Sequence, residues 1–147
     1  MIRKMINEAV NNLQPLIEEK KAAIHFELNA ANPVVNGDKN YLMIVMINLV
    51  ENALKYSIDP YVTIKTQKAD RYFQITVKDN GLGIEEKYLK DIFKRFFRIP
   101  KGDIYPSKGF GIGLSFVKKI IDSHKGKIIV KSIPGKGSEF IINLNNS

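Results

Sequence analysis

The stretch NLVENALKYS, residues 48 to 57, carries two asparagines that stand one helical turn apart. Asparagine is a poor helix former, because its side-chain amide competes for nearby backbone groups. An amide oxygen is nevertheless a hard ligand suited to Mg²⁺, and a lysine can add a point charge for a phosphate. Asn48, Asn52 and Lys55 share one stripe that could serve a metal-bound phosphate, although paired asparagines on a helix are more often simply exposed to solvent.

The helix that carries this first stretch is expected to begin after Asp38, a suitable N-cap, and to run through residues 39–57. Apolar residues at helical spacing predict further helices at 2–22, 85–96 and 111–126. Pro15 should kink or divide the first of them, and Gly126 should close the last as its C-cap.

Residues of alternating polarity predict the strands of the fold. They are expected at 23–29, 61–67, 72–79, 127–133 and 139–145. The second and third strands should form one hairpin, and the last two strands another. Because helices and hairpins are interspersed, we expect the α+β class. The predicted architecture is a two-layer sandwich, with a mixed, mainly antiparallel sheet of about five strands covered on one face by about three helices.

The second notable stretch is VKDNGLGI, residues 77 to 84, where a strand is expected to end at Asp79. Gly81 and Gly83 then allow a close approach of the backbone or a positive φ. A carboxylate at a strand end can accept a hydrogen bond from an exocyclic amine such as that of adenine. The simpler interpretation is an ordinary Asp-Asn-Gly turn, which this stretch alone favours.

The third stretch is KGFGIGLS, residues 108 to 115, in which Gly109, Gly111 and Gly113 alternate before an expected helix. The backbone N–H groups of such a turn can wrap a phosphate, and the helix N-terminus favours its negative charge. The spacing is not that of a P-loop, nor does the stretch follow a strand as a dinucleotide-binding fingerprint does. Each stretch alone is weak evidence, but the three in this order are specific.

Composition narrows the possible classes of protein. The chain has 147 residues, 44% hydrophobic and 26% charged, which is typical of one soluble globular domain. It has no cysteine, which excludes disulfides and cysteine metal sites. The net charge of +8 is spread along the chain without a dense basic run, so we expect no nucleic-acid partner. No apolar run approaches the roughly 20 residues of a membrane span, so we expect no direct membrane contact.

Taken together, the three stretches resemble the ATP-binding catalytic domain of bacterial sensor histidine kinases, in the superfamily shared with DNA gyrase. NLVENALKYS is similar to the family's N box, DNGLGI to its G1 box and GFGIGL to its G2 box. FKRFF, residues 93 to 97, is similar to its F box, and GDKNYL and PGKGSEF also resemble the family. The resemblance covers nearly the whole chain and implies the Bergerat fold, with a flexible lid over ATP.

The resemblance implies a site for ATP and Mg²⁺. By it, Asn52 coordinates the metal, Asn48 lines the phosphate region and Lys55 lies near the phosphates. Tyr56 packs on the adenine, and Asp79 bonds its amino group. The other implied nucleotide-binding residues are Gly81, Gly83, Ile84, Phe93, Lys108, Gly109, Phe110, Gly111, Ile112, Gly113 and Leu114. The implied catalytic residues are Asn48, Lys55, Arg95 and Arg98, with the two arginines reaching toward the γ-phosphate.

The aromatic residues and the lid also have interpretations that need no resemblance. Phe93, Phe96 and Phe97 recur at near-helical spacing, and at least two of them are expected simply to pack. Tyr56 could likewise belong to the core. The segment 98–108 holds glycine and prolines but few large apolar residues, so we expect it to be mobile without nucleotide.

The residue types favour phosphoryl transfer over hydrolysis. Hydrolytic relatives in the superfamily place a glutamate base four residues before the metal asparagine, where this chain has Asn48. Glu51 is acidic but lies about 100° away from Asn52 around the helix. Neither His25 nor His124 is followed by the acidic pattern of a phosphoacceptor, so we interpret both as structural.

The resemblance therefore implies the catalytic module of a two-component kinase, which phosphorylates a histidine on a separate dimerisation and phosphoacceptor hairpin. We expect a single cytoplasmic domain, residues 1–147, monomeric in isolation, with the hairpin upstream in a parent protein that could be an inner-membrane sensor. A response regulator is an indirect partner. The alternative is a nucleotide-binding regulatory or anti-sigma serine-kinase-like module of the same fold.

Overall fold

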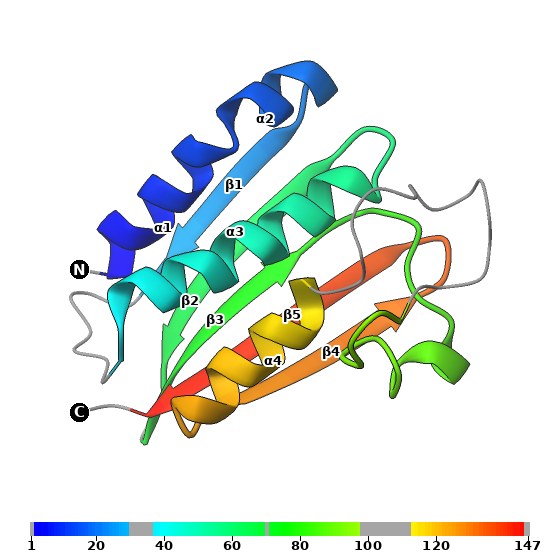
Figure 1. Ribbon diagram of the computed structural model, residues 1–147. Coiled ribbons are helices and arrows are strands. Elements are labelled where there is room, and N and C mark those ends of the chain that lie inside the picture. Colours follow the sequence, from blue (N-terminus) through cyan, green and yellow to red (C-terminus); the bar gives the residue numbers. More distant parts are fainter. Residues whose placement is uncertain (1, 30–36, 70, 98–112, 146–147) are drawn as a thin grey trace.

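One mixed β-sheet organises the protein in a computed structural model that describes residues 2–29, 37–69, 71–97 and 113–145 (Figure 1). Its strands are β1 (Ala23–Leu28), β2 (Tyr61–Lys68), β3 (Tyr72–Lys78), β4 (Lys127–Ile133) and β5 (Gly137–Asn145). In the described part of the chain these make a five-stranded sheet in the order β1-β2-β3-β5-β4. β1 pairs with β2 in parallel, and the other neighbours pair antiparallel. The predicted mixed, mainly antiparallel sheet is confirmed.

Helices cover one face of this sheet (Figure 1). The α-helices of the described residues are α1 (Ile2–Asn12), α2 (Gln14–Lys20), α3 (Lys39–Lys55) and α4 (Gly113–Ser123). Pro15, in the first turn of α2, separates α2 from α1, as predicted. Among the described residues, no helix is both long and apolar enough to cross a membrane.

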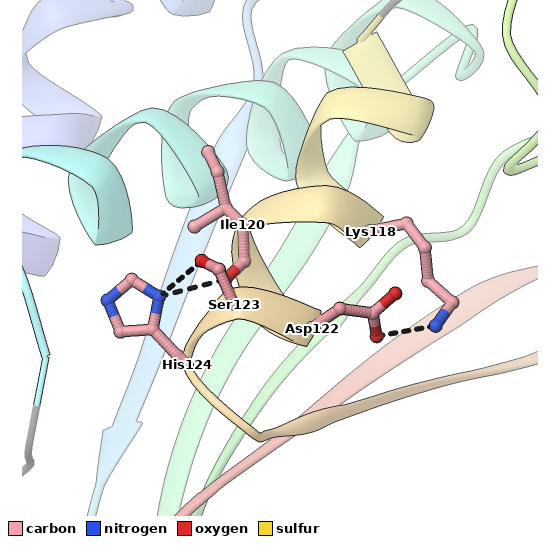
Figure 2. A network of polar contacts seen from close by, with 5 residues as sticks. All are labelled: Lys118, Ile120, Asp122, Ser123 and His124. Atoms are coloured by element: carbon pink, nitrogen blue, oxygen red, sulfur yellow. Dashed lines mark hydrogen bonds and ion pairs between the residues drawn. The ribbon is translucent and has the colours of Figure 1, made fainter.

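Helix α3 begins where the sequence predicts. Oδ1 of Asp38 accepts hydrogen bonds from the N–H groups of Asn40 at 2.9 Å and Tyr41 at 3.3 Å, which makes Asp38 the N-cap. His124, which follows α4, contacts the start of the same helix: its Nε2 accepts a hydrogen bond from the N–H of Asp38 at 3.0 Å. Its other ring nitrogen, Nδ1, lies 2.8 Å from the carbonyl of Ile120 (Figure 2). His124 therefore joins two helices, which agrees with a structural role.

The helix predicted at 85–96 is wrong. Only a 3₁₀ helix, η1 (Glu86–Tyr88), forms there, and turns follow it. Ile92 is buried, and Phe93 and Phe97 pack against the core, so anchoring side chains fix the path of this segment. The hydrogen bonds of so short a helix would contribute little against the cost of its nucleation.

The end of α4 also differs from the prediction in one detail. Lys125, rather than Gly126, adopts the left-handed conformation, with φ of 57°. The N–H of Gly126 bonds the carbonyl of Ile121 at 2.9 Å, and that of Lys125 bonds the carbonyl of Asp122 at 2.9 Å, as in a Schellman motif. Glycine is required at position 126 for another reason, because a Cβ there would lie 2.6 Å from the carbonyl oxygen of Asn143 in β5.

Candidate functional site

The C-terminal end of α3 lies against the loop that follows β3. The N–H of Leu82 donates a hydrogen bond to the carbonyl of Tyr56 at 3.0 Å. A Cβ on Gly81 would lie 2.4 Å from that carbonyl oxygen and 2.7 Å from Oγ of Ser57. The two segments are so close that only glycine fits at position 81 without a shift of the backbone. The first and second stretches of the sequence are therefore neighbours in space.

Asp79 lies half-buried just after the end of β3. Its Oδ1 accepts hydrogen bonds from the N–H groups of Gly81 at 2.8 Å and Ser138 at 3.2 Å. Burial raises the pKa of the Asp79 carboxyl above its ordinary value, and the two N–H groups oppose that rise. The fold thus holds one carboxyl oxygen in a fixed orientation, in surroundings that disfavour the charged form.

Asn48 connects the middle of α3 to the start of α4. Its Nδ2 donates to the carbonyl of Ile44 at 2.9 Å, one turn earlier in the helix. A Cβ on Gly113, the first residue of α4, would lie 2.9 Å from Oδ1 of Asn48. The structure therefore places Gly113, near the end of the third stretch, against the first stretch.

Asn52 and Lys55, the other polar residues of the α3 stripe, are both half-buried. Nζ of Lys55 lies 2.6 Å from Oε1 of Glu51, so these two residues form an ion pair across one turn. The side chains are 26% and 36% exposed, and partly exposed pairs of this kind contribute little to stability. Lys55 can therefore exchange Glu51 for an anionic ligand at a small cost in free energy.

A model of the family described as "Histidine kinase-, DNA gyrase B-, and HSP90-like ATPase" matches residues 37–147, which include all three stretches. The chain belongs to this ATPase family. Its α3, its loop after β3 and the start of its α4 all lie within the matched residues, and these are the segments that meet at the candidate site.

Curated relatives of this ATPase domain include a sensor protein and a sensor histidine kinase. Sensor protein RprX from Bacteroides fragilis (strain YCH46) is 36% identical over 144 residues, which are 96% of this chain and 28% of the relative. Sensor histidine kinase RcsC from Escherichia coli (strain K12) is 32% identical over 143 residues, which are 97% of this chain and 15% of the relative. The chain therefore spans less than a third of the length of these relatives.

The fold of this ATPase domain also matches a solved structure. The catalytic domain of histidine kinase ThkA, in a nucleotide-free form, superimposes with a TM-score of 0.85 at 27% sequence identity. The match covers 99% of this chain and 94% of that domain. The predicted resemblance to histidine kinase catalytic domains is confirmed.

The FKRFF segment combines packing residues with an exposed pair. Phe93 lies edge-on to Phe140 with 6.4 Å between ring centroids, and Phe97 lies 6.0 Å from Tyr88. Two of the three phenylalanines therefore pack, as expected. Phe96 is instead 61% exposed, and the guanidinium carbon of Arg95 lies 4.9 Å from its ring centroid. Arg95 is thus held at the surface of this ATPase domain by a cation–π contact.

Part of the predicted site lies outside the described residues: Arg98, Lys108, Gly109, Phe110, Gly111 and Ile112, with the segment 98–108 that is predicted to be mobile. Three predicted residues not yet described, Gly83, Ile84 and Leu114, lie in the loop after β3 or against the core. Gly83 adopts a left-handed φ of 73°, and the N–H of Ile84 donates to Oγ of Ser132 at 2.7 Å. Leu114 is half-buried and packs against the core.

Three serines at the site were not singled out from the sequence. Ser57 is 3% exposed, and its hydroxyl donates to the carbonyl of Ala53 at 2.7 Å. Ser138 bonds Asp79 through its N–H, and its Oγ lies 2.8 Å from Oγ of Ser132. The three serines thus lie around the loop after β3: Ser57 next to Gly81, Ser132 bonded to Ile84, and Ser138 bonded to Asp79. Ser57 lies within NLVENALKYS and Ser138 within PGKGSEF, and their place in these two stretches is the sequence feature that could have indicated them as site residues.

We expect Gly81→Ala to lower the midpoint of thermal unfolding, because the new Cβ would overlap the backbone of Tyr56. Overpacking of this kind costs about 1–3 kcal/mol. Circular dichroism melts would measure the change. Gly135→Ala is the comparison: its Cβ would meet nothing within 4 Å, so any loss of stability there reports the backbone strain of a φ of +81° without overlap. A Gly81→Ala variant as stable as the wild type would contradict the close approach.

Proposed function

We propose that this domain binds Mg-ATP and donates the γ-phosphoryl group to a histidine on a separate dimerisation and phosphoacceptor hairpin. The observation that carries the proposal is the meeting of three segments: α3, the loop after β3 and the start of α4. The loop after β3 contacts the carbonyl of Tyr56, and the start of α4 lies against Asn48. The name of one curated relative, sensor histidine kinase RcsC, supports the same reaction class.

In this proposal the adenine lies between Asp79 and Tyr56. A carboxylate oriented by two backbone N–H groups accepts a hydrogen bond from the exocyclic amine of adenine. Guanine carries a carbonyl at that position and cannot donate the same bond, so the site would select adenine. Tyr56 packs on the base, while Gly81 and Gly83 let the backbone close around it. Ile84 and Phe93 complete this end of the site.

The triphosphate lies along the polar stripe of α3. The amide oxygen of Asn52 is a hard ligand that fits Mg²⁺ bound to phosphate oxygens, and Asn48 lines the same region. When bound, Mg²⁺ neutralises charge that develops on the transferring phosphoryl group. Lys55 adds a positive charge once the phosphates displace Glu51. We assign the remaining predicted residues to the lid and the γ-phosphate: Arg95, Arg98, Lys108, Gly109, Phe110, Gly111, Ile112, Gly113 and Leu114.

The transfer breaks the bond between the γ-phosphorus and the oxygen that bridges it to ADP. A bond to a ring nitrogen of the acceptor histidine forms, ADP leaves with the electron pair of the broken bond, and the histidine loses its ring proton to water. This domain supplies positioning and charge neutralisation. Water attack is disfavoured because Asn48 cannot act as a base and Glu51 lies about 100° away from Asn52 around α3. His124 is engaged between two helices, and His25 lies 3.7 Å from Glu27 on β1, so we assign neither as the acceptor.

The partners follow from the reaction. The hairpin of the parent protein is the direct acceptor, and a response regulator receives the phosphoryl group from it. Histidine kinase ThkA, which shares this fold, has been solved in complex with response regulator protein TrrA. Since ATP is an intracellular substrate, we place this domain in the cytoplasm.

The proposal is tested by incubating the chain with γ-labelled ATP, Mg²⁺ and the hairpin of its parent protein. The label is expected on the hairpin, and a hairpin without its acceptor histidine is the control that stays unlabelled. The chain alone should release little inorganic phosphate, because Asn48 stands where a base for water would be needed and cannot accept a proton. Rapid phosphate release with no labelled hairpin would instead place the domain among the hydrolytic members of the family.

A further inference from the structure

A lysine from the N-terminal part of the chain holds the C-terminal end of α3. Lys20, the last residue of α2, is half-buried. Its Nζ donates to the carbonyl of Ser57 at 2.9 Å and to that of Lys55 at 3.4 Å. Lys20 lies outside residues 37–147, which the family model matches. Its contacts nevertheless fall on the part of α3 that borders the site.

The two carbonyls that Lys20 binds stand on either side of the carbonyl of Tyr56 in the sequence. The last carbonyls of a helix have no partner within the helix and carry partial negative charge, which an ammonium group stabilises. The carbonyl of Tyr56 accepts the N–H of Leu82 at 3.0 Å. Lys20 and Leu82 therefore bind three successive carbonyls, those of residues 55–57.

The end of α2 determines where Lys20 points. Lys21 adopts a left-handed φ of 52°, and its N–H bonds the carbonyl of Glu18 at 3.2 Å. The N–H of Ala22 bonds the carbonyl of Ile17 at 2.9 Å, which completes a Schellman motif. Ile17 is buried in the core, so packing fixes the last turn of α2. The position of Lys20 therefore follows any movement of α2.

We propose that Lys20 is a positioning residue for the nucleotide site and acts through the backbone of residues 55–57. It fixes the carbonyl of Tyr56 against Leu82 and Gly81, and so sets the spacing between Tyr56 and Asp79. The N-terminal helices thereby control affinity for the base without touching the nucleotide. This inference rests on the proposed function, because it concerns the adenine end of that site.

The test compares Lys20→Met with wild type by calorimetric titration of ADP and of GDP. Loss of the ammonium group is expected to raise the dissociation constant of ADP about five- to tenfold, and to reduce the preference for ADP over GDP. Lys20→Arg should restore both, because it keeps the charge and the donors. Lys21→Met is the matched control: it removes the same charge from an exposed neighbour and should leave both dissociation constants unchanged.

A structural role alone would lower the melting temperature of Lys20→Met and leave the ratio of the two dissociation constants unchanged, and that result would overturn the inference. If Lys20→Met does not fold, Lys20→Gln, which keeps a donor without the charge, takes its place with the same expected loss of preference. Absence of ADP binding by the wild-type chain would overturn the proposed function itself. The wild-type titration therefore separates the two failures.

Discussion

Asp79→Asn is expected to weaken the binding of ADP by about 100-fold or more, because a half-buried acceptor matched to the adenine amine is lost. The asparagine oxygen can still accept the N–H groups of Gly81 and Ser138, which bond a single oxygen of Asp79. Its NH₂ group would then occupy the place of the second carboxyl oxygen and oppose the amine of the base. Calorimetric titration with ADP measures the loss directly.

The same substitution should leave the fold intact, which separates binding from stability. Burial raises the pKa of Asp79 above its unfolded value, so the fold favours the protonated form. Such a group stabilises the folded state below its unfolded pKa, and that contribution is lost as the pH rises through the folded pKa. At pH 7 a neutral asparagine avoids the cost of the buried charge, so we expect a melting midpoint at or above that of the wild type.

The control for this prediction is Asp59→Asn. Asp59 is exposed, and its backbone carbonyl accepts a hydrogen bond from the side-chain amide of Asn80, so it lies beside the same loop. Its substitution changes the net charge equally and should leave the affinity for ADP unchanged. An Asp79→Asn variant that binds ADP as tightly as the wild type would show that Asp79 does not accept a hydrogen bond from the adenine.

The long elements of the fold could be predicted because the signals that define them are local. Asp38 caps α3 through its own side chain, and the hairpin of β2 and β3 follows from alternation and a short turn. The segment 85–96 could not be predicted in the same way. Its apolar residues fit a helix, but the burial of Ile92 in the core decides its path. Likewise, no local pattern indicates that β1 pairs in parallel with β2, because that pairing depends on long-range contacts.

At the candidate site, the sequence indicates which residues gather but not how they are held. The pairing of Lys55 with Glu51 follows from their spacing on one helix. The contact between Leu82 and Tyr56 depends on how the loop after β3 meets α3, which no single stretch encodes. Lys20 is 37 residues from Ser57, so only the packing of α2 against α3 brings the two together.

The largest effect on chemistry is expected at Asn52, which we assign to Mg²⁺. Asn52→Ala should slow phosphoryl transfer to the hairpin by about 1000-fold, since a bound metal contributes several kcal/mol of charge stabilisation in the transition state. The helix should persist, because alanine is the better helix former and position 52 is only half-buried. Single-turnover labelling of the hairpin with γ-labelled ATP measures the rate.

Nucleotide binding and metal dependence should separate in this variant. The contacts assigned to adenine come from Asp79 and Tyr56, so affinity for ADP without Mg²⁺ should stay near that of the wild type. The gain in affinity that Mg²⁺ gives the wild type should disappear. Asn40→Ala, at the exposed first turn of the same helix, controls for the loss of an asparagine. If Asn52→Ala keeps the full transfer rate and the full effect of Mg²⁺ on affinity, then the side-chain amide of Asn52 is not a ligand of the metal. The ligand that α3 supplies would then be Asn48, whose Oδ1 lies toward Gly113.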